Sequence, residues 1–244
     1  RTDIGQRLGA APLRYGLQPI IWVHAVSLGE INAARGLVAE LHAQLPDYRV
    51  VVSSTTDTGM AAARKLFGHD HAVFRWPLDF SLAVARAIDR IRPSLVVLVE
   101  GEVWPNFLSA CNRRKIPVVV VNGRLSADKG YPGYKKLGPI ATRLFNRLTA
   151  IGAQHETYAE RYRSLGVRPE KVSVTGMLKY DTAQIADYVR TLPDTPRSTT
   201  VPRDVLVEAR DRVEKHIKNS YLKRVDAPVG VGPKLVCWME LNGG

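Results

Sequence analysis

Residues 95–99 read Leu-Val-Val-Leu-Val, and residues 118–121 read Val-Val-Val-Val. Neither stretch alternates apolar with polar side chains, which is typical of parallel strands that helices cover on both faces. Other short β-branched runs predict strands at Ile20–Val26, Arg49–Ser53, Ala72–Trp76, Pro117–Val121, Leu148–Ile151 and Lys171–Val174. Amphipathic patterns between them predict helices at Glu30–Gln44, Thr58–Phe67, Ser81–Ile91, Val103–Arg113, Tyr134–Arg147 and His155–Leu165.

This alternation of strands and helices predicts an α/β fold, a Rossmann-like doubly wound parallel sheet over roughly residues 18–180. We place the domain at residues 1–185. Three prolines and a Ser-Thr-Thr run mark Leu192–Pro202, so residues 186–202 are interpreted as a linker. Residues 203–244 form an unassigned tail, in which the charged amphipathic segment Asp204–Lys223 predicts one helix outside the domain core.

Composition narrows the class of protein. Cys111 and Cys237 are too few and too far apart for a metal framework or a disulfide scaffold, which favours a reducing compartment. No apolar run reaches the roughly 18 residues that a membrane-spanning helix needs. The chain opens on Arg1 rather than on methionine, which leaves room for a membrane anchor or signal upstream.

Positive charge is concentrated in one part of the sequence. The formal net charge is +12, and Arg113–Arg147 holds nine Lys and Arg residues against one acid, Asp128. Such a stretch suits nucleic acid, a phosphorylated substrate or an anionic membrane, although a solvated basic face explains it equally well. No nucleic-acid motif accompanies it, so we expect no nucleic-acid partner.

Residues 22–30 read Trp-Val-His-Ala-Val-Ser-Leu-Gly-Glu, a predicted strand followed by a turn and a glutamate. Gly29 would let a ligand approach the backbone closely, and Glu30 is a candidate general base at the sheet edge where ligands bind. Ser27 and Glu30 also have the spacing of a capping box, in which the carboxylate returns a hydrogen bond to the Ser27 N–H. His24 lies within the apolar run and is interpreted as a core histidine.

Further polar groups follow later predicted strands, at the same edge of the sheet. Glu100 and Glu102 would point to the same side of an extended backbone, so one of them would need a partner or a raised pKa. Asn122 and Arg124 come next. Arg124 could bind a carboxylate or phosphate with two hydrogen bonds, or pair with a glutamate as scaffolding. Lys179 and Asp181 have the spacing of a surface pair.

Taken together, the motifs resemble the 3-deoxy-D-manno-octulosonic acid (Kdo) transferase family over roughly residues 5–185. They are, in order, Trp22–Glu30, Thr55-Thr-Asp-Thr-Gly59, Trp76-Pro-Leu-Asp79, Glu100-Gly-Glu-Val-Trp-Pro-Asn106, Asn122-Gly-Arg-Leu-Ser126 and Gly176-Met-Leu-Lys-Tyr-Asp181. The resemblance implies the amino-terminal half of a GT-B glycosyltransferase that transfers Kdo from CMP-Kdo to a lipid A precursor in lipopolysaccharide biosynthesis.

The resemblance also implies roles for residues. Glu30 would be the general base of an inverting, metal-independent transfer that needs no cofactor beyond the donor substrate CMP-Kdo. Ser27, Gly29, Glu100, Asn122, Arg124 and Lys179 would support it or bind substrate. The basic stretch would attract lipid A phosphates and an anionic bilayer, which implies a peripheral location on the cytoplasmic face of the bacterial inner membrane.

Two departures from the family pattern keep alternatives open. Gly101 and Gly123 stand where relatives carry threonine or alanine, and residues 201–244 match no donor-binding segment. The rival hypotheses are therefore a catalytically inactive or truncated acceptor-binding module and a GT-B enzyme for another sugar nucleotide. The positive charge alone suggests a third, a nucleic-acid-binding protein. The sequence gives no indication of the oligomeric state.

Overall fold

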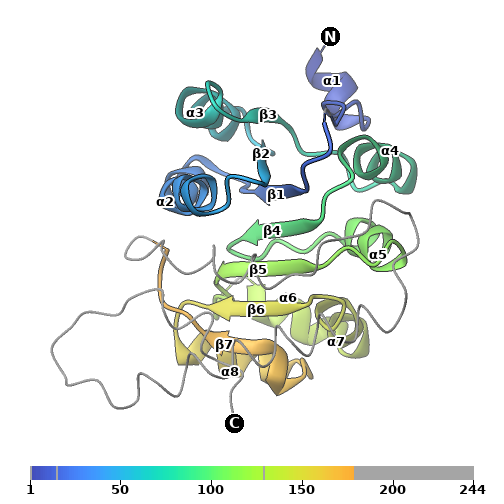
Figure 1. Ribbon diagram of the computed structural model, residues 1–244. Coiled ribbons are helices and arrows are strands. Elements are labelled where there is room, and N and C mark those ends of the chain that lie inside the picture. The colour runs from blue at the N-terminus through green and yellow to red at the C-terminus, as the bar shows by residue number, and fades with distance from the viewer. Residues whose placement is uncertain (1, 15, 129, 179–244) are drawn as a thin grey trace, which may run out of the picture.

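The computed structural model describes residues 2–14, 16–128 and 130–178, and all seven strands within them form one parallel sheet. The strands are β1 (Ile20–His24), β2 (Arg49–Ser54), β3 (Ala72–Arg75), β4 (Leu95–Val99), β5 (Val118–Gly123), β6 (Ala150–Ala153) and β7 (Val172–Val174). Their order is β3-β2-β1-β4-β5-β6-β7, which Figure 1 shows from top to bottom. The predicted Rossmann-like doubly wound sheet is confirmed.

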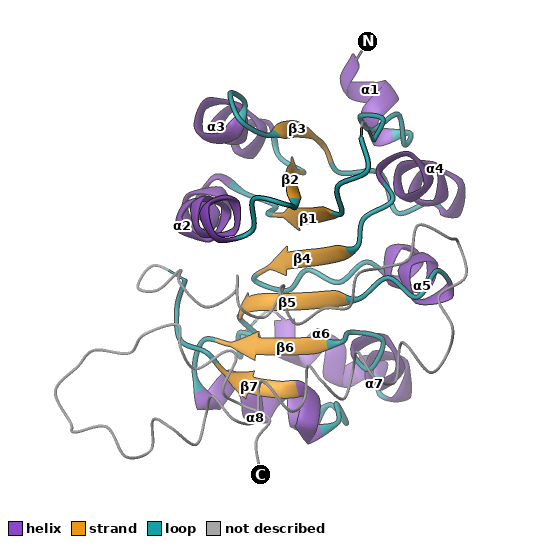
Figure 2. Ribbon diagram, viewed as in Figure 1, coloured by secondary structure: helices purple, strands orange, loops and turns teal. Residues whose placement is uncertain are grey.

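Helices connect the strands. They are α1 (Thr2–Arg7), α2 (Leu28–Gln44), α3 (Asp57–Phe67), α4 (Ser81–Ile91), α5 (Pro105–Arg113), α6 (Gly130–Leu137), α7 (Pro139–Phe145) and α8 (Glu156–Ser164), with a 3-10 turn at Pro169–Lys171. Figure 2 shows the helices outside the strands, with α2 and α3 on one side and α4, α5 and α7 on the other. Among the described residues, no helix is long and apolar enough to cross a bilayer.

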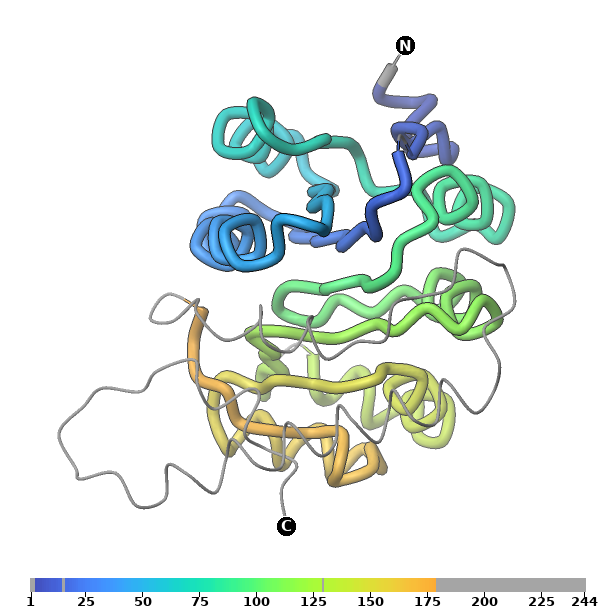
Figure 3. The backbone as a smooth tube through the Cα atoms, in the orientation of Figure 1, coloured from blue at the N-terminus to red at the C-terminus, as the bar shows by residue number. Residues whose placement is uncertain are grey.

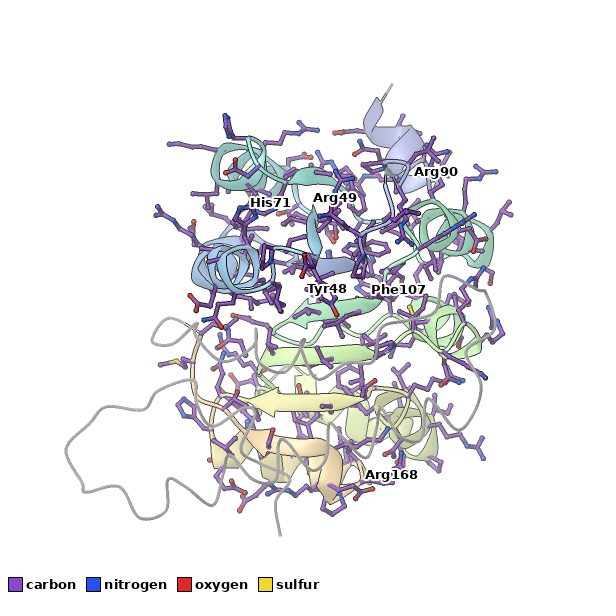
Figure 4. All side chains as sticks on the ribbon, in the orientation of Figure 1. Tyr48, Arg49, His71, Arg90, Phe107 and Arg168 are labelled. Atoms are coloured by element: carbon purple, nitrogen blue, oxygen red, sulfur yellow. The ribbon has the colours of Figure 1, made fainter. Side chains whose placement is uncertain are left out.

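Two hydrophobic layers fill the space between the sheet and these helices. One joins alternate side chains of β1, β2 and β4 to α2 and α3, and the other joins the opposite set to α4, α5, α7 and α8. The residues of β4 are at most 2% exposed, which confirms the central, doubly covered strand that residues 95–99 predict. In the second layer, Trp22 meets Phe107 edge to face with their ring centroids 5.2 Å apart, and Figure 4 labels Phe107.

Two features differ from the predicted elements. The helix predicted over Tyr134–Arg147 is wrong, because α6 ends at Leu137 and α7 begins at Pro139. Gly138 between them has a φ of 48°, and a proline disfavours helical backbone in the residue before it.

The sequence reading also missed α1, which lies beside α4 in Figure 3. The Arg86 guanidinium of α4 donates to the Leu8 carbonyl just after α1. The predicted linker, the helix at Asp204–Lys223 and the Lys179–Asp181 pair lie outside the described residues.

Candidate functional site

The strand order reverses between β1 and β4, which pair directly. From this point the chain passes to α2 after β1 and to α5 after β4, on opposite faces of the sheet. In open α/β sheets the crevice at such a switch point is where ligands bind. Glu30 lies in the first turn of α2, and Glu100 directly follows β4, so the two glutamates flank this crevice.

The Glu30 carboxylate is held by its own loop. Oε2 accepts the Val26 N–H at 2.8 Å, and Oε1 accepts the Ser27 hydroxyl at 3.0 Å. Ser27 is the N-cap of α2, as the capping-box interpretation requires, but the backbone donor to the carboxylate is Val26 rather than Ser27. Because each carboxylate oxygen has a second lone pair, both contacts leave room for a proton from a ligand.

Burial of the Glu30 side chain, which is 9% exposed, raises the pKa of its carboxyl to about 7. The negative charges of Glu100 and Glu102 act in the same direction, while the hydrogen bonds from Val26 and Ser27 oppose it. A general base works best with a pKa near the operating pH. Glu30 therefore has the ionisation behaviour that the base hypothesis requires.

This pKa makes stability depend on pH. Between pH 4.5 and about 7 the folded chain keeps the Glu30 proton that the unfolded chain has released, so the free energy of unfolding falls as pH rises through this window. At 1.36 kcal/mol per pKa unit, the loss between pH 5 and pH 8 is about 2–3 kcal/mol. Glu30→Gln has no such proton to release. Its free energy of unfolding, measured in urea, should therefore rise by about 2–3 kcal/mol relative to that of the wild type between pH 5 and pH 8. A pH-independent difference between the two proteins would contradict the assignment.

The loop after β4 turns sharply. Glu100 has a φ of 64° and Gly101 a φ of 94°, so the prediction that Glu100 and Glu102 share one side of an extended backbone is wrong. Desolvation of its carboxyl raises the pKa of Glu102. A Cβ on Gly101 would lie 3.1 Å from both the Tyr162 hydroxyl and a Val120 methyl, so the turn is also tightly packed.

Asn122, near the end of β5, contacts both the residue that follows β4 and the segment that follows β7. Its amide Nδ2 donates to Glu100 Oε1 at 3.4 Å, and its Oδ1 accepts the Leu178 N–H at 3.1 Å. Its own φ is 56°, in the left-handed region that asparagine tolerates better than most residues. This contact confirms the expectation that Asn122 and Glu100 lie at the same edge of the sheet.

Other predicted site residues are less engaged. Arg124 is exposed, its N–H donates to the Glu100 carbonyl at 3.2 Å, and no ion pair between described residues joins its guanidinium to Glu100 or Glu102. Gly29 is exposed in the first turn of α2, where an added Cβ would meet only Ser27 Oγ, at 3.9 Å. Lys179 lies outside the described residues.

His24 is buried, 1% exposed, and stacks on Trp76 with ring centroids 3.8 Å apart. Its Nδ1 lies 2.9 Å from the Ser53 hydroxyl and 3.1 Å from the Ser53 carbonyl. Burial lowers its pKa to about 3, so the ring is neutral at physiological pH. The core interpretation holds, although Nε2 has no hydrogen-bond partner within the described part of the chain.

Sequence reasoning missed what two motifs do. Asp79 follows β3 and accepts the N–H groups of Asn106 and Phe107 at 3.0 and 2.8 Å, so it caps α5 from a distant loop. Ser54 and Thr56, at the end of β2 and the start of α3, both donate to the Val26 carbonyl. The Thr56 cap could be recognised from the local pattern, but these long-range contacts could not.

The basic stretch is not one surface. Arg113 is the last residue of α5, Arg114 and Lys115 follow it, and Arg147 follows α7. These four residues therefore precede β5 and β6, at the edge of the sheet opposite Glu30. Arg114 pairs there with Asp89 at 3.0 Å. Clustering in the sequence therefore does not become clustering in space. Over residues 2–178, apart from the undescribed positions, no group of three metal-ligating side chains could hold a metal ion.

The family model of 3-deoxy-D-manno-octulosonic-acid transferase (kdotransferase) matches residues 2–182. A 3-deoxy-D-manno-octulosonic acid transferase of Haemophilus influenzae is 34% identical over 161 residues, 66% of this chain and 38% of that protein. One from Bordetella pertussis is 37% identical over 191 residues, 71% and 42% of the two chains. A bifunctional glycosyltransferase/methyltransferase of Fusobacterium nucleatum is 35% identical over 74% of this chain and 28% of its own.

Among solved structures, a putative UDP-N-acetylglucosamine 2-epimerase of Listeria monocytogenes matches with a TM-score of 0.50 at 12% identity, over 75% of this chain and 49% of that one. At this identity the likeness shows the fold alone, which is the Rossmann-like half expected of a GT-B architecture. The chain spans about two fifths of the Haemophilus and Bordetella relatives. With three quarters of its residues matched by the family model, the chain belongs to the 3-deoxy-D-manno-octulosonic acid transferase family.

Proposed function

We propose that this domain binds a lipid A precursor and supplies the general base for an inverting, metal-independent transfer of Kdo from CMP-Kdo. The observation that carries the proposal is the Glu30 carboxylate, buried at the β1–β4 switch point with a pKa of about 7. Family membership supports Kdo transfer in general, and the donor and acceptor are our proposal.

In the proposed reaction, Glu30 accepts the proton of an acceptor sugar hydroxyl. The hydroxyl oxygen forms a bond to the anomeric carbon of Kdo, and the bond from that carbon to the CMP phosphate oxygen breaks. CMP leaves with the bonding electrons, and the configuration at the anomeric carbon inverts. A hydroxyl is a weak nucleophile until a positioned base removes its proton, and such a base contributes about 10²–10⁴ in rate.

Neighbouring residues orient the Glu30 carboxylate and raise its pKa. Val26 and Ser27 fix the direction of the carboxylate through their hydrogen bonds. Burial raises the pKa of Glu30, and the charge of Glu100, which Asn122 holds, adds to this effect, so that Glu30 can take up a proton near neutral pH. Arg124 is exposed beside this edge and suits an acceptor phosphate.

Incubation of this domain together with a donor-binding half, in the presence of CMP-Kdo and a lipid A precursor, tests the proposal. Product formation supports it. Lipid A binding without turnover indicates an acceptor-binding module, and turnover only with another sugar nucleotide indicates a different GT-B enzyme. Steeply salt-dependent binding to DNA without affinity for lipid A would favour a nucleic-acid-binding protein.

The acceptor is a membrane lipid, and we propose that the domain meets the cytoplasmic face of the bacterial inner membrane peripherally. Five exposed apolar side chains support this. They lie on α1 and just after it, on the loop after β3 and at the start of α4: Ile4, Leu8, Leu78, Phe80 and Leu82. Backbone contacts join these segments, since the Leu78 N–H donates to the Arg7 carbonyl. The exposed Arg86 adds positive charge beside them.

Joint replacement of Phe80 and Leu82 by serine should lower recovery on anionic liposomes by about tenfold or more, because each side chain would lose its burial in lipid. Ile140→Ser, at an equally exposed position of α7, should bind like the wild type. Flotation with anionic and with neutral liposomes measures both contributions. Equal recovery of the wild type on anionic and neutral liposomes would show that charge does not contribute to binding. Full binding by the double variant would show that Phe80 and Leu82 do not contribute.

A further inference from the structure

We propose that Ser54 and Thr56 are positioning residues for the Glu30 carboxylate, and that they act through the backbone of Val26. The inference rests on the proposed function only in treating Glu30 as the base, because the contacts themselves are independent of any reaction. It gives a physical role to the Thr55–Gly59 motif, which the mechanism does not otherwise use.

The Val26 carbonyl oxygen accepts three hydrogen bonds from the last residue of β2 and the N-cap residue of α3. The Ser54 hydroxyl lies at 2.9 Å, the Thr56 hydroxyl at 3.0 Å and the Thr56 N–H at 3.1 Å. One residue earlier, the Ala25 N–H donates to the Ser53 carbonyl and extends the β1–β2 pairing. The backbone at residues 25 and 26 is therefore held by the end of β2 and the N-cap of α3.

The other polar group of Val26 faces the base. Its N–H donates to Glu30 Oε2 at 2.8 Å, and the direction of this bond depends on the backbone angles of Val26. Ordinary capping of α3 needs only the Thr56 hydroxyl, which accepts the Gly59 N–H at 3.1 Å. Ser54 adds nothing to that cap, so its hydrogen bond to Val26 indicates a second purpose.

Gly59 gives the two hydroxyls their room. A Cβ at this position would lie 2.3 Å from Ser54 Oγ, 2.9 Å from Thr56 Oγ1 and 3.0 Å from the Val26 carbonyl oxygen. Residue 59 is helical and has an ordinary φ, so this glycine is required by space rather than by backbone conformation. All three atoms that such a Cβ would approach belong to the hydrogen bonds at the Val26 carbonyl oxygen.

Loss of the Ser54 hydroxyl should let Val26 rotate and weaken its bond to Glu30. That bond stabilises the charged carboxylate, whereas burial and the facing charges of Glu100 and Glu102 oppose charge. Weakening it should therefore raise the pKa of Glu30 further. The experiment follows the Glu30 carboxyl carbon by NMR during a pH titration of the 244-residue chain, with Glu30→Gln used to assign the signal.

Ser54→Ala should raise the Glu30 pKa by about 0.5 to 1 pH unit, as expected for loss of part of one hydrogen bond. Thr56→Val should do the same, and Thr56→Ser should restore the wild-type value. The matched controls are Ser173→Ala and Thr175→Val, which remove buried hydroxyls that donate to the Ile151 and Ala153 carbonyls, away from Glu30. They should leave the titration unchanged.

An unshifted titration in a folded Ser54→Ala or Thr56→Val, or the same shift in the controls, would overturn the proposal. The titration needs no turnover, so it is separate from the proposed function. If the pKa shifts but Glu30→Gln retains full activity alongside a donor-binding half, the positioning stands and the base role fails. If the pKa does not shift but Glu30→Gln loses activity, Glu30 remains the base and the positioning role of Ser54 and Thr56 fails.

Discussion

Replacement of Glu30 by glutamine is expected to lower kcat by about 10²–10⁴, with acceptor binding retained. Glutamine can still accept the Val26 N–H through its amide oxygen, so α2 should begin as before, but it cannot take a proton from the acceptor hydroxyl. The measurement is Kdo transfer by a protein that carries this domain together with a donor-binding half. An unchanged KM would show that the loss lies in the chemical step.

Glu40→Gln is the matched control, since Glu40 lies on the same helix and pairs only with Gln44 among the contacts described. It should leave kcat unchanged. Full activity of Glu30→Gln would end the assignment of Glu30 as base and leave the capping contact as its whole role. Equal losses in both variants would indicate damage to α2 rather than a catalytic effect.

The largest expected effect on stability comes from Phe107→Ala. Phe107 is 0% exposed, and its ring lies 5.2 Å from that of Trp22 and 4.3 Å from that of Trp76. Truncation of a buried phenylalanine removes its apolar contacts and leaves a cavity, which costs about 3–5 kcal/mol. Urea unfolding should show a free energy of unfolding lower by that amount, with an unchanged slope.

Phe80→Ala provides the comparison, because Phe80 is 64% exposed and should change stability by no more than about 0.5 kcal/mol. Phe107→Leu should fall between the two, since it retains part of the apolar volume. A loss below about 1 kcal/mol in Phe107→Ala would mean that this aromatic layer can close around the cavity, contrary to the packing described.

The elements of the sheet could be predicted because parallel strands buried on both faces require continuous apolar runs, as at residues 95–99. The order of the strands could not, because it depends on which runs pair across the sheet. The predicted edge placed Glu30 and Glu100 together correctly. The position of that edge at the reversal between β1 and β4 became visible only with the topology.

Local details were predicted wrongly for different reasons. A positive φ at Glu100 is rare for a residue with a side chain, so the extended backbone assumed there was the ordinary expectation. The break at Gly138-Pro139 did have a signal, and the apolar periodicity across it outweighed that signal in the prediction. The Val26 contact joins residues about 30 positions apart and has no counterpart in local patterns.

The loop after β3 joins the exposed apolar side chains near α1 and α4 to the start of α5, the helix that follows Glu100 and Glu102. Leu78 and Phe80 are exposed, while Asp79 between them holds the first turn of α5 through two backbone hydrogen bonds. That turn of α5 begins three residues after Glu102. If contact with a bilayer displaced Leu78 and Phe80, Asp79 between them would move as well. Through its carboxylate, that movement would reach the first turn of α5 and so the segment that carries Glu102.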